Sequence, residues 1–127
     1  MATHPNKKEI FVIGCGRWGT FIAWYLDKIG HSVTLYGRES SARMQVLQTE
    51  RKNEQLTLSD SLALTTDLSG CLSAEIIVIS IGAQQLAGLA EQLCSLDLQN
   101  KTIVLCMKGI EIGTGRRLSE ICAEALA

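Results

Sequence analysis

The sequence predicts an α/β fold: a doubly wound parallel sheet in three layers with the strand order 3-2-1-4-5. Two observations lead to this prediction. Short apolar runs alternate with amphipathic helical segments along the chain, without an intervening linker or repeat. The first two runs and the helix between them also fit into about thirty residues, the length of a βαβ unit, whose right-handed crossover makes its two strands parallel.

The first βαβ unit is predicted from residues 9–36. Residues 9–14, EIFVIG, are apolar and rich in β-branched side chains, as in a strand that is buried on both faces. In residues 17–29 apolar side chains recur every three or four positions, which predicts a helix that Gly30 ends. Residues 32–36, SVTLY, supply the second strand.

The remaining elements are predicted within the same single domain. Residues 1–8 are expected to be a disordered or flexible amino terminus, and residues 9–127 to form the domain. The elements expected after the first unit are a polar helix in 40–55, a weak strand in 62–65, a helical turn in 67–72, a strand in 75–82, a helix carrying Leu86, Leu89, Ala90 and Leu93, a strand in 102–107 and an amphipathic helix in 115–126.

Composition argues against several function classes. With 12 Lys and Arg against 13 Asp and Glu, the net charge is −1, which disfavours a nucleic-acid-binding or anionic-membrane surface. The apolar runs are too short to cross a bilayer and the amino terminus lacks the apolar core of a signal peptide, so we expect a cytoplasmic protein. The five cysteines form no Cys-x-x-Cys pair and are interpreted as reduced, mostly buried residues, with no metal site expected.

A glycine-rich turn carries the clearest functional pattern. Gly14, Gly16 and Gly19 form G-x-G-x-x-G between the first strand and the first helix, the context that marks a dinucleotide-binding, or Rossmann, fold. The first glycine permits the tight turn, the second lets a pyrophosphate approach the backbone, and the third allows close helix–strand packing. The helix amino terminus adds amide donors and a favourable dipole. We predict dinucleotide binding; the alternative is a glycine turn that binds nothing.

Arg17 and Trp18 fall in the first turn of that helix, so both are candidate cofactor-binding residues. Their side chains can reach over a bound nucleotide or toward a facing domain. Trp18 would also suit an apolar core, but its place beside the phosphate loop favours a binding role.

The end of the second strand usually decides between the two nicotinamide cofactors, because an acidic residue there binds the ribose 2′-hydroxyl and repels a 2′-phosphate. Arg38 is placed to pair with a 2′-phosphate, whereas Glu39 next to it leaves a route to NAD. We expect NADP to be preferred over NAD; a solvated Arg-Glu pair is the alternative without function.

Lys108 follows the fifth strand and therefore faces the same cleft. Its ammonium could hold a substrate phosphate or polarise a carbonyl that receives a hydride. From spacing alone, an ordinary exposed loop lysine is an equal alternative.

Five stretches together resemble one family. GCGRWGTFIAWYL (14–26), GHSVTLYGR (30–38), RKN (51–53), TTDL (65–68) and KGIEIGTGRRLSEI (108–121) resemble, in order, bacterial NAD(P)-dependent glycerol-3-phosphate dehydrogenase. The resemblance covers nearly the whole chain from Lys8 onward. It implies the amino-terminal cofactor-binding domain of an enzyme that interconverts dihydroxyacetone phosphate and sn-glycerol 3-phosphate for phospholipid synthesis.

The resemblance also implies roles for the site. Lys108 would contact both cofactor and substrate, while the general acid/base lysine and most substrate-binding residues belong to a carboxy-terminal helical domain without a counterpart in this sequence. No catalytic residue is therefore expected here, and the chain alone is expected to be inactive. It can self-associate through the apolar surface that the second domain would cover.

Two departures from the family pattern stand out. Gly82-Ala83-Gln84 replaces Pro-Ser-Gln, so the loop beside the nicotinamide is expected to be looser. The stretch Tyr-Leu-Pro-Gly is absent after Asn53, which leaves the path of residues 51–58 undefined.

Two other functions stay open at this point. One is the cofactor-binding domain of a 2- or 3-hydroxy acid reductase, against which the Lys-Gly-Ile-Glu stretch at 108–111 argues. The other is a non-catalytic nucleotide-binding sensor module, which the fold by itself does not reject.

Overall fold

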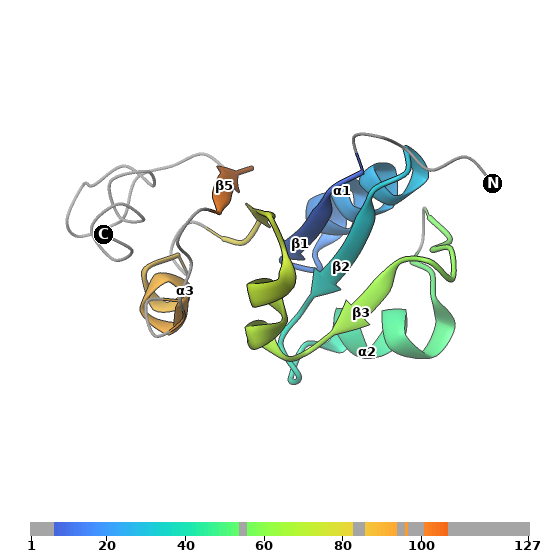
Figure 1. Cartoon of the computed structure of the whole chain (residues 1–127). Helices are drawn as coiled ribbons and strands as arrows, with labels where there is room; N and C mark the ends of the chain where they lie inside the picture. Colours follow the sequence, from blue (N-terminus) through green and yellow to red (C-terminus); the bar gives the residue numbers. More distant parts are fainter. Residues whose placement is uncertain (1–6, 54–55, 83–85, 94–95, 97–100, 107–127) are drawn as a thin grey trace.

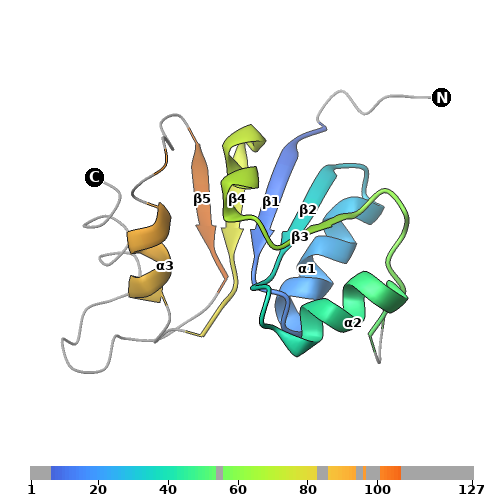
Figure 2. The same cartoon turned by 90° about the horizontal axis from the view of Figure 1, so that it is seen from below.

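The computed structural model describes residues 7–53, 56–82, 86–93, 96 and 101–106, which form a parallel sheet with helices on both faces. Its strand order is β3-β2-β1-β4-β5, as predicted. The strands are β1 (Glu9–Ile13), β2 (Ser32–Tyr36), β3 (Ala63–Thr65), β4 (Ile76–Ile79) and β5 (Thr102–Leu105). Figure 1 shows β1, β2 and β3 side by side, and Figure 2 shows β5, β4 and β1 with their arrowheads pointing the same way.

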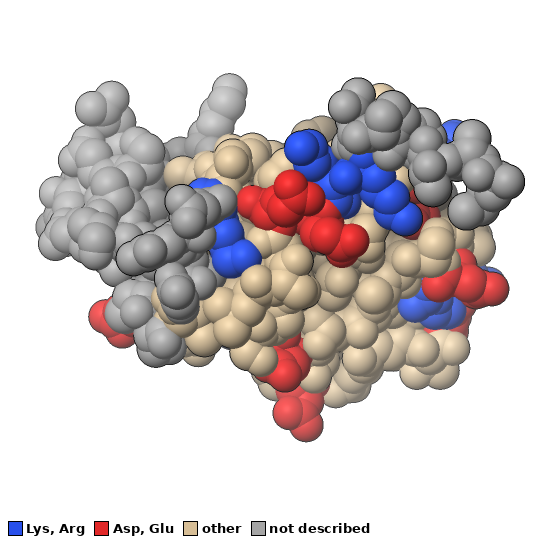
Figure 3. Space-filling view, viewed as in Figure 1, with Lys and Arg blue, Asp and Glu red and all other residues tan. Residues whose placement is uncertain are grey.

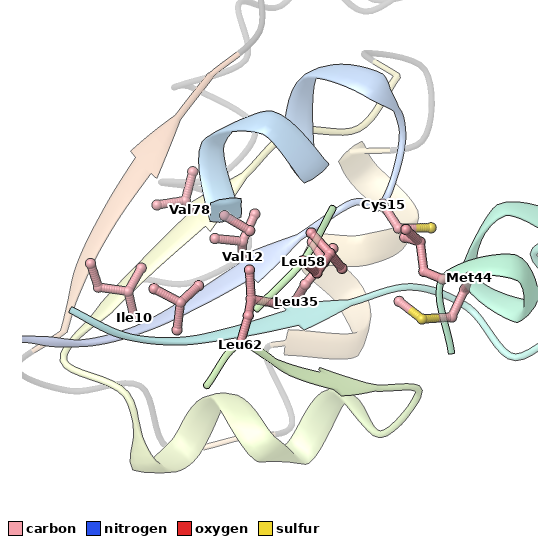
Figure 4. Close-up of a cluster of buried hydrophobic side chains, with 11 residues drawn as sticks. Ile10, Val12, Cys15, Leu35, Met44, Leu58, Leu62 and Val78 are labelled. Carbon is pink, nitrogen blue, oxygen red and sulfur yellow. The ribbon is translucent and has the colours of Figure 1, made fainter. Parts of the chain in front are cut away.

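The helices are α1 (Arg17–Lys28), α2 (Ala42–Glu50), the short 3-10 helix η1 (Leu68–Ser73) and α3 (Leu86–Leu93). Side chains of β1 alternate between two separate cores, because successive residues of a strand point to opposite faces. Ile10 and Val12 pack with α1 and α2, whereas Phe11 and Ile13 pack with η1 and α3. Figure 4 shows the first of these cores, with Cys15 and Met44 at the end nearest α2. The predicted three layers are therefore confirmed.

The end of α1 follows from its last residues. Gly30 has a φ of +107°, its N–H donates to Asp27 O (3.1 Å), and the N–H of His31 donates to Leu26 O (3.1 Å). These bonds are those of a Schellman motif, in which glycine is favoured because the left-handed conformation costs it nothing. The predicted stop at Gly30 is confirmed.

The helix predicted in residues 40–55 is shorter in the structure, where α2 ends at Glu50. Arg51 adopts a left-handed conformation (φ 58°), and its Nη2 donates to Leu62 O (2.6 Å) and to Ser59 O. The chain then reverses, with an antiparallel bridge between Lys52 and Thr57 and a bond from Leu58 N–H to Arg51 O (2.8 Å). This hairpin is the path of residues 51–58, apart from positions 54 and 55.

The strands predicted in residues 75–82 and 102–107 are right in position, and each ends before the last described residue of its predicted range. The strand predicted in 75–82 is Ile76–Ile79, and the one in 102–107 is Thr102–Leu105. The amphipathic helix predicted in 115–126 and Lys108 lie outside the described residues. Among the described helices, none is long and apolar enough to cross a membrane. On the face in Figure 3, acidic and basic side chains lie beside one another in small groups.

Candidate functional site

A cleft of about 660 Å³ opens at the carboxyl ends of β1, β2 and β4. In doubly wound sheets ligands bind at this edge, where the strand order reverses. The six predicted site residues that the structure describes all line the cleft: Gly14, Gly16, Arg17, Trp18, Gly19 and Arg38. The structure therefore brings the glycine-rich loop and the end of β2 together, as the sequence predicts.

Gly14 and Gly19 are glycines because the backbone around them is crowded. Gly14 has a φ of +116°, and a Cβ there would lie 2.0 Å from the carbonyl oxygen of Ser80, at the end of β4. A Cβ on Gly19 would lie 1.9 Å from the carbonyl oxygen of Gly14. The loop is thus wedged between β4 and the first turn of α1, where no side chain fits.

Gly16 differs from its two neighbours in the motif. Its φ is −67°, which any residue adopts, and a Cβ there would have nothing within 4 Å. Packing within the described residues therefore does not require glycine at this position. The open space in front of it faces the cleft, which is what close approach of a bound pyrophosphate needs.

The amino terminus of α1 presents positive potential to this space. Gly16 is its N-cap and makes no side-chain cap, and the first turn holds no acidic residue. Backbone N–H groups of a first helical turn lack partners within the helix, and the helix dipole favours an anion there. Arg17 adds a full positive charge at the same place. The site therefore has the donors that hold phosphate in dinucleotide-binding folds.

A buried threonine fixes the loop from beneath. Thr20 is 1% exposed, and its Oγ1 donates to the backbone oxygen of Cys15 (3.0 Å). Cys15 is itself buried, with its Sγ 3.4 Å from Ser41 Oγ, so the loop is tied to α1 and to the start of α2. The sequence interpretation assigned no role to Thr20 or Ser41. A hydroxyl residue directly after the motif was the available signal.

Trp18 lies at the mouth of the cleft with 60% of its surface exposed. Its ring stacks on that of Phe21, with the centroids 5.5 Å apart. The alternative that Trp18 belongs to the apolar core is therefore wrong. Its exposed indole forms part of the lining of the cleft.

The far end of the cleft lies at the turn after β2. Arg38, Ser41 and Arg43 line it, whereas Glu39 does not and is exposed to solvent. Burial raises the pKa of Tyr36, which also lines the cleft; the Arg38 guanidinium acts in the opposite direction. Sequence reasoning found Arg38 and missed Arg43, because Arg43 follows in a polar helix that offered no pattern.

Gly37 is the residue that lets this turn approach the phosphate loop. A Cβ at Gly37 would lie 2.6 Å from Cys15 Sγ and 2.8 Å from Met44 Cε. The loop after β1 and helix α2 therefore meet over a position that has no room for a side chain. A glycine directly after a strand was the signal that could have revealed this contact.

Comparison with known proteins decides the family. Residues 9–127 match the family described as the NAD-dependent glycerol-3-phosphate dehydrogenase N-terminus. The chain belongs to this family. It is accordingly an NAD(P)-binding domain of the glycerol-3-phosphate dehydrogenase type, and the resemblance inferred from the sequence is confirmed.

Individual relatives agree with this family. Glycerol-3-phosphate dehydrogenase [NAD(P)+] of Chlorobium luteolum is 41% identical over 124 residues, which cover 93% of this chain and 37% of the relative. The crystal structure of glycerol-3-phosphate dehydrogenase from Coxiella burnetii superposes with a TM-score of 0.85 at 26% identity, over 96% of this chain and 38% of that one. The chain thus spans little more than a third of the length of these glycerol-3-phosphate dehydrogenases.

The same fold occurs in hydroxy acid dehydrogenases. The structure of 3-hydroxybutyryl-CoA dehydrogenase from Escherichia coli superposes with a TM-score of 0.60 at 22% identity, covering 83% of this chain and 25% of that one. A likeness at this level shows the Rossmann fold alone. The match of residues 9–127 to the glycerol-3-phosphate dehydrogenase family favours the main interpretation over the hydroxy acid reductase and the sensor module.

Proposed function

We propose that this glycerol-3-phosphate dehydrogenase domain binds NADP in preference to NAD. The pyrophosphate would lie at the amino terminus of α1, in the open space in front of Gly16. The placement of the dinucleotide rests on Gly16, which faces the cleft with nothing among the described residues within 4 Å of a Cβ, whereas a Cβ at Gly14 or Gly19 would meet backbone. Packing among the described residues does not require glycine at position 16, whereas close approach of a pyrophosphate does. The preference for NADP rests on Arg38, which lines the cleft where Glu39 does not.

Each residue of the cleft then has a distinct role. Arg17 supplies charge to the pyrophosphate, and Trp18 covers the nucleotide at the cleft mouth. Arg38 pairs with the 2′-phosphate of NADP through its planar guanidinium, which suits bidentate binding. Lys108, which lies outside the described residues, would contact both the substrate and the cofactor, as the family resemblance implies.

We further propose the reaction for which the relatives are named. Dihydroxyacetone phosphate, NAD(P)H and a proton give sn-glycerol 3-phosphate and NAD(P)+, reversibly. Bound NAD(P)H supplies the hydride that reduces the C2 carbonyl. This chain covers 37% of the length of its relative from Chlorobium luteolum. The groups that transfer the proton and bind the substrate would come from the part of such an enzyme that this chain does not span. The chain alone is expected to bind cofactor without turnover.

The outer face of α1 is the surface through which we expect this chain to self-associate. Phe21, Tyr25 and Ile29 are exposed there together with Trp18, and Phe21 and Tyr25 stack with centroids 6.5 Å apart. A contiguous apolar patch of this kind marks an interaction surface. Sedimentation over a range of concentrations should show association; a strictly monomeric chain would refute it.

The cofactor proposal is tested by titrating the chain with NADPH and with NADH while following tryptophan fluorescence. Trp18 lines the cleft and Trp24 does not, so quenching should fall on Trp18, and Trp24→Phe should keep the signal. An Arg38→Ala variant should bind NADPH about tenfold more weakly, as expected for one charge-assisted contact, with little effect on NADH. Absence of saturable binding of both cofactors would refute the proposal.

A further inference from the structure

We propose that Arg43 is a second anchor for the ribose 2′-phosphate and, with Arg38, sets the preference for NADP over NAD. The inference rests on the proposed function, because it concerns one end of the same cleft. It assigns a specificity-determining role to a residue of α2 that carries no recognisable motif.

Position supports this role first. Arg38 follows β2 and Arg43 lies in the first turn of α2, and both line the cleft together with Ser41 between them. A short turn joins the two arginines, because the Ser41 N–H donates to the backbone oxygen of Arg38 (2.9 Å). Ser41 then caps α2 by accepting a bond from the N–H of Met44 (3.3 Å). The two arginines therefore lie on either side of one hydrogen-bonded turn.

Packing holds this turn in place although its arginines are exposed. Met44 is fully buried, and it lies so close to Gly37 that a Cβ added there would be 2.8 Å from Met44 Cε and 2.6 Å from Cys15 Sγ. The start of α2 is thus fixed against the phosphate loop. Only the side chains of Arg38 and Arg43 need to be ordered when an anion binds, which limits the entropic cost of binding.

Charge supports the role independently. Three arginines line the cleft, Arg17, Arg38 and Arg43, and among the described lining residues there is no aspartate or glutamate. Neither Arg38 nor Arg43 has an ion-pair or hydrogen-bond partner for its guanidinium within the described part of the chain. A chain of net charge −1 therefore concentrates unpaired positive charge at both ends of one cleft.

Two separated cationic ends fit a ligand with two separated anionic groups. Arg17 and the α1 amino terminus suit the pyrophosphate, which leaves Arg38 and Arg43 for a second anion near the end of β2. In Rossmann folds this is where the adenosine ribose lies, and NADP differs from NAD there by one phosphate. The start of α2 adds a helix dipole that favours negative charge.

Arg43 also borders a neighbouring hollow of about 320 Å³, which Thr20 and Asn53 help to line between α1 and α2. A side chain turned into that hollow would not reach the cofactor. The test must therefore separate a contact to the 2′-phosphate from a structural position beside the loop.

The test compares Arg43→Gln, Arg43→Lys and a control, Lys8→Gln, in titrations of the whole chain with NADPH and NADH. Lys8 pairs with Glu75 (3.9 Å) at the amino-terminal ends of β1 and β4, whereas the cleft lies at the carboxyl ends of the strands. Its replacement therefore removes one positive charge without altering the cleft. Arg43→Gln should weaken NADPH binding about tenfold and change NADH binding less than about twofold. Arg43→Lys should retain part of the affinity, since it keeps the charge and loses the bidentate geometry. Lys8→Gln should behave as the wild type.

The outcomes separate the two proposals. Equal losses for both cofactors, or no loss for either, would overturn the role of Arg43 while leaving the cofactor site intact. A wild-type chain that binds NADH but not NADPH would overturn both the role of Arg43 and the proposed preference for NADP, while leaving the dinucleotide site in place. If the wild-type chain binds neither cofactor, the proposed function fails and this inference fails with it. A weaker dependence of NADPH binding on salt in Arg43→Gln than in the wild type would support an ion pair between Arg43 and the 2′-phosphate that the variant has lost.

Discussion

The two ends of the cleft are built in different ways. At the phosphate loop, backbone packs directly against backbone, with Gly14 wedged against Ser80 and Gly19 against Gly14. At the turn after β2, the surface that faces the cleft consists of exposed arginines on a turn that is fixed from below by Gly37 and Met44. One end is therefore built from closely packed backbone, while the other presents charged side chains.

This difference separates affinity from specificity. The loop can accept the pyrophosphate that NAD and NADP share, because its donors are backbone groups. The turn can distinguish the two cofactors, because its donors are side chains whose replacement leaves the backbone unchanged. Substitutions of Gly14 or Gly19 should therefore affect folding and the binding of both cofactors, whereas substitutions of Arg38 or Arg43 should affect the binding of NADPH alone.

The largest effect is expected for Gly19→Ala. Alanine normally stabilises a helix relative to glycine, but here its Cβ would lie 1.9 Å from a backbone oxygen, which must move. We expect a loss of about 3 kcal/mol or more in the free energy of unfolding, at the upper end of overpacking effects. Chemical denaturation measures it. Gly88→Ala is the matched control: it also lies in a helix, has nothing within 4 Å of the Cβ, and should gain about 0.5–1 kcal/mol.

Gly37→Ala tests the contact between the phosphate loop and the start of α2. Its Cβ would meet Cys15 Sγ and the flexible end of Met44, so part of the clash can relax by movement of side chains. We expect a smaller loss of stability, about 1–3 kcal/mol, together with weaker binding of both cofactors because the start of α2 shifts away from the loop. Unchanged stability would mean that the turn is not held by this contact.

Thr20→Val probes the support of the phosphate loop alone. Valine keeps the shape of the buried side chain and removes the bond to the Cys15 oxygen. Loss of one such hydrogen bond should cost about 1 kcal/mol of unfolding free energy. The ratio of NADPH to NADH affinity should stay as in the wild type; a change in this ratio would contradict the division of roles between the two ends.

The smallest effect concerns Asp67, which lies after β3 near Tyr36. The Ser69 hydroxyl and backbone N–H both donate to Asp67, and these bonds hold its pKa below the ordinary value. Because the folded-state pKa is lowered, the stability that these bonds add is present above the unfolded-state pKa and is lost as the pH falls through the folded one. Ser69→Ala should raise the pKa of Asp67 part of the way back, as an NMR titration would show, without changing cofactor binding.

The sequence was most informative where structure depends on local sterics. Glycine spacing between an apolar strand and an amphipathic helix predicted the phosphate loop, and the alternation of strands and helices predicted the doubly wound sheet with the observed strand order. Gly30 predicted the end of α1 for the same reason, because a residue without a Cβ adopts the left-handed conformation readily.

The sequence was least informative where long-range contacts decide. The helix predicted to residue 55 ends at Glu50 because the guanidinium of Arg51 bonds to carbonyls of Ser59 and Leu62, which a local pattern does not contain. Arg43 was missed because its place in the lining of the cleft depends on how the turn between Arg38 and α2 folds. The sequence offered a glycine directly after a strand at Gly37, but the side chains that would meet its Cβ, those of Met44 and Cys15, come from other elements and are known only from the structure.

The most direct test of the whole account is cofactor binding by Gly16→Ala. Gly16 has room for a Cβ in the protein, so the variant should lose no more than about 1 kcal/mol of stability, the cost of a poorer N-cap. Its added methyl group would occupy the space assigned to the pyrophosphate, so NADPH and NADH should both bind at least about tenfold more weakly. A folded Gly16→Ala variant that binds both cofactors like the wild type would contradict the placement of the dinucleotide in this cleft.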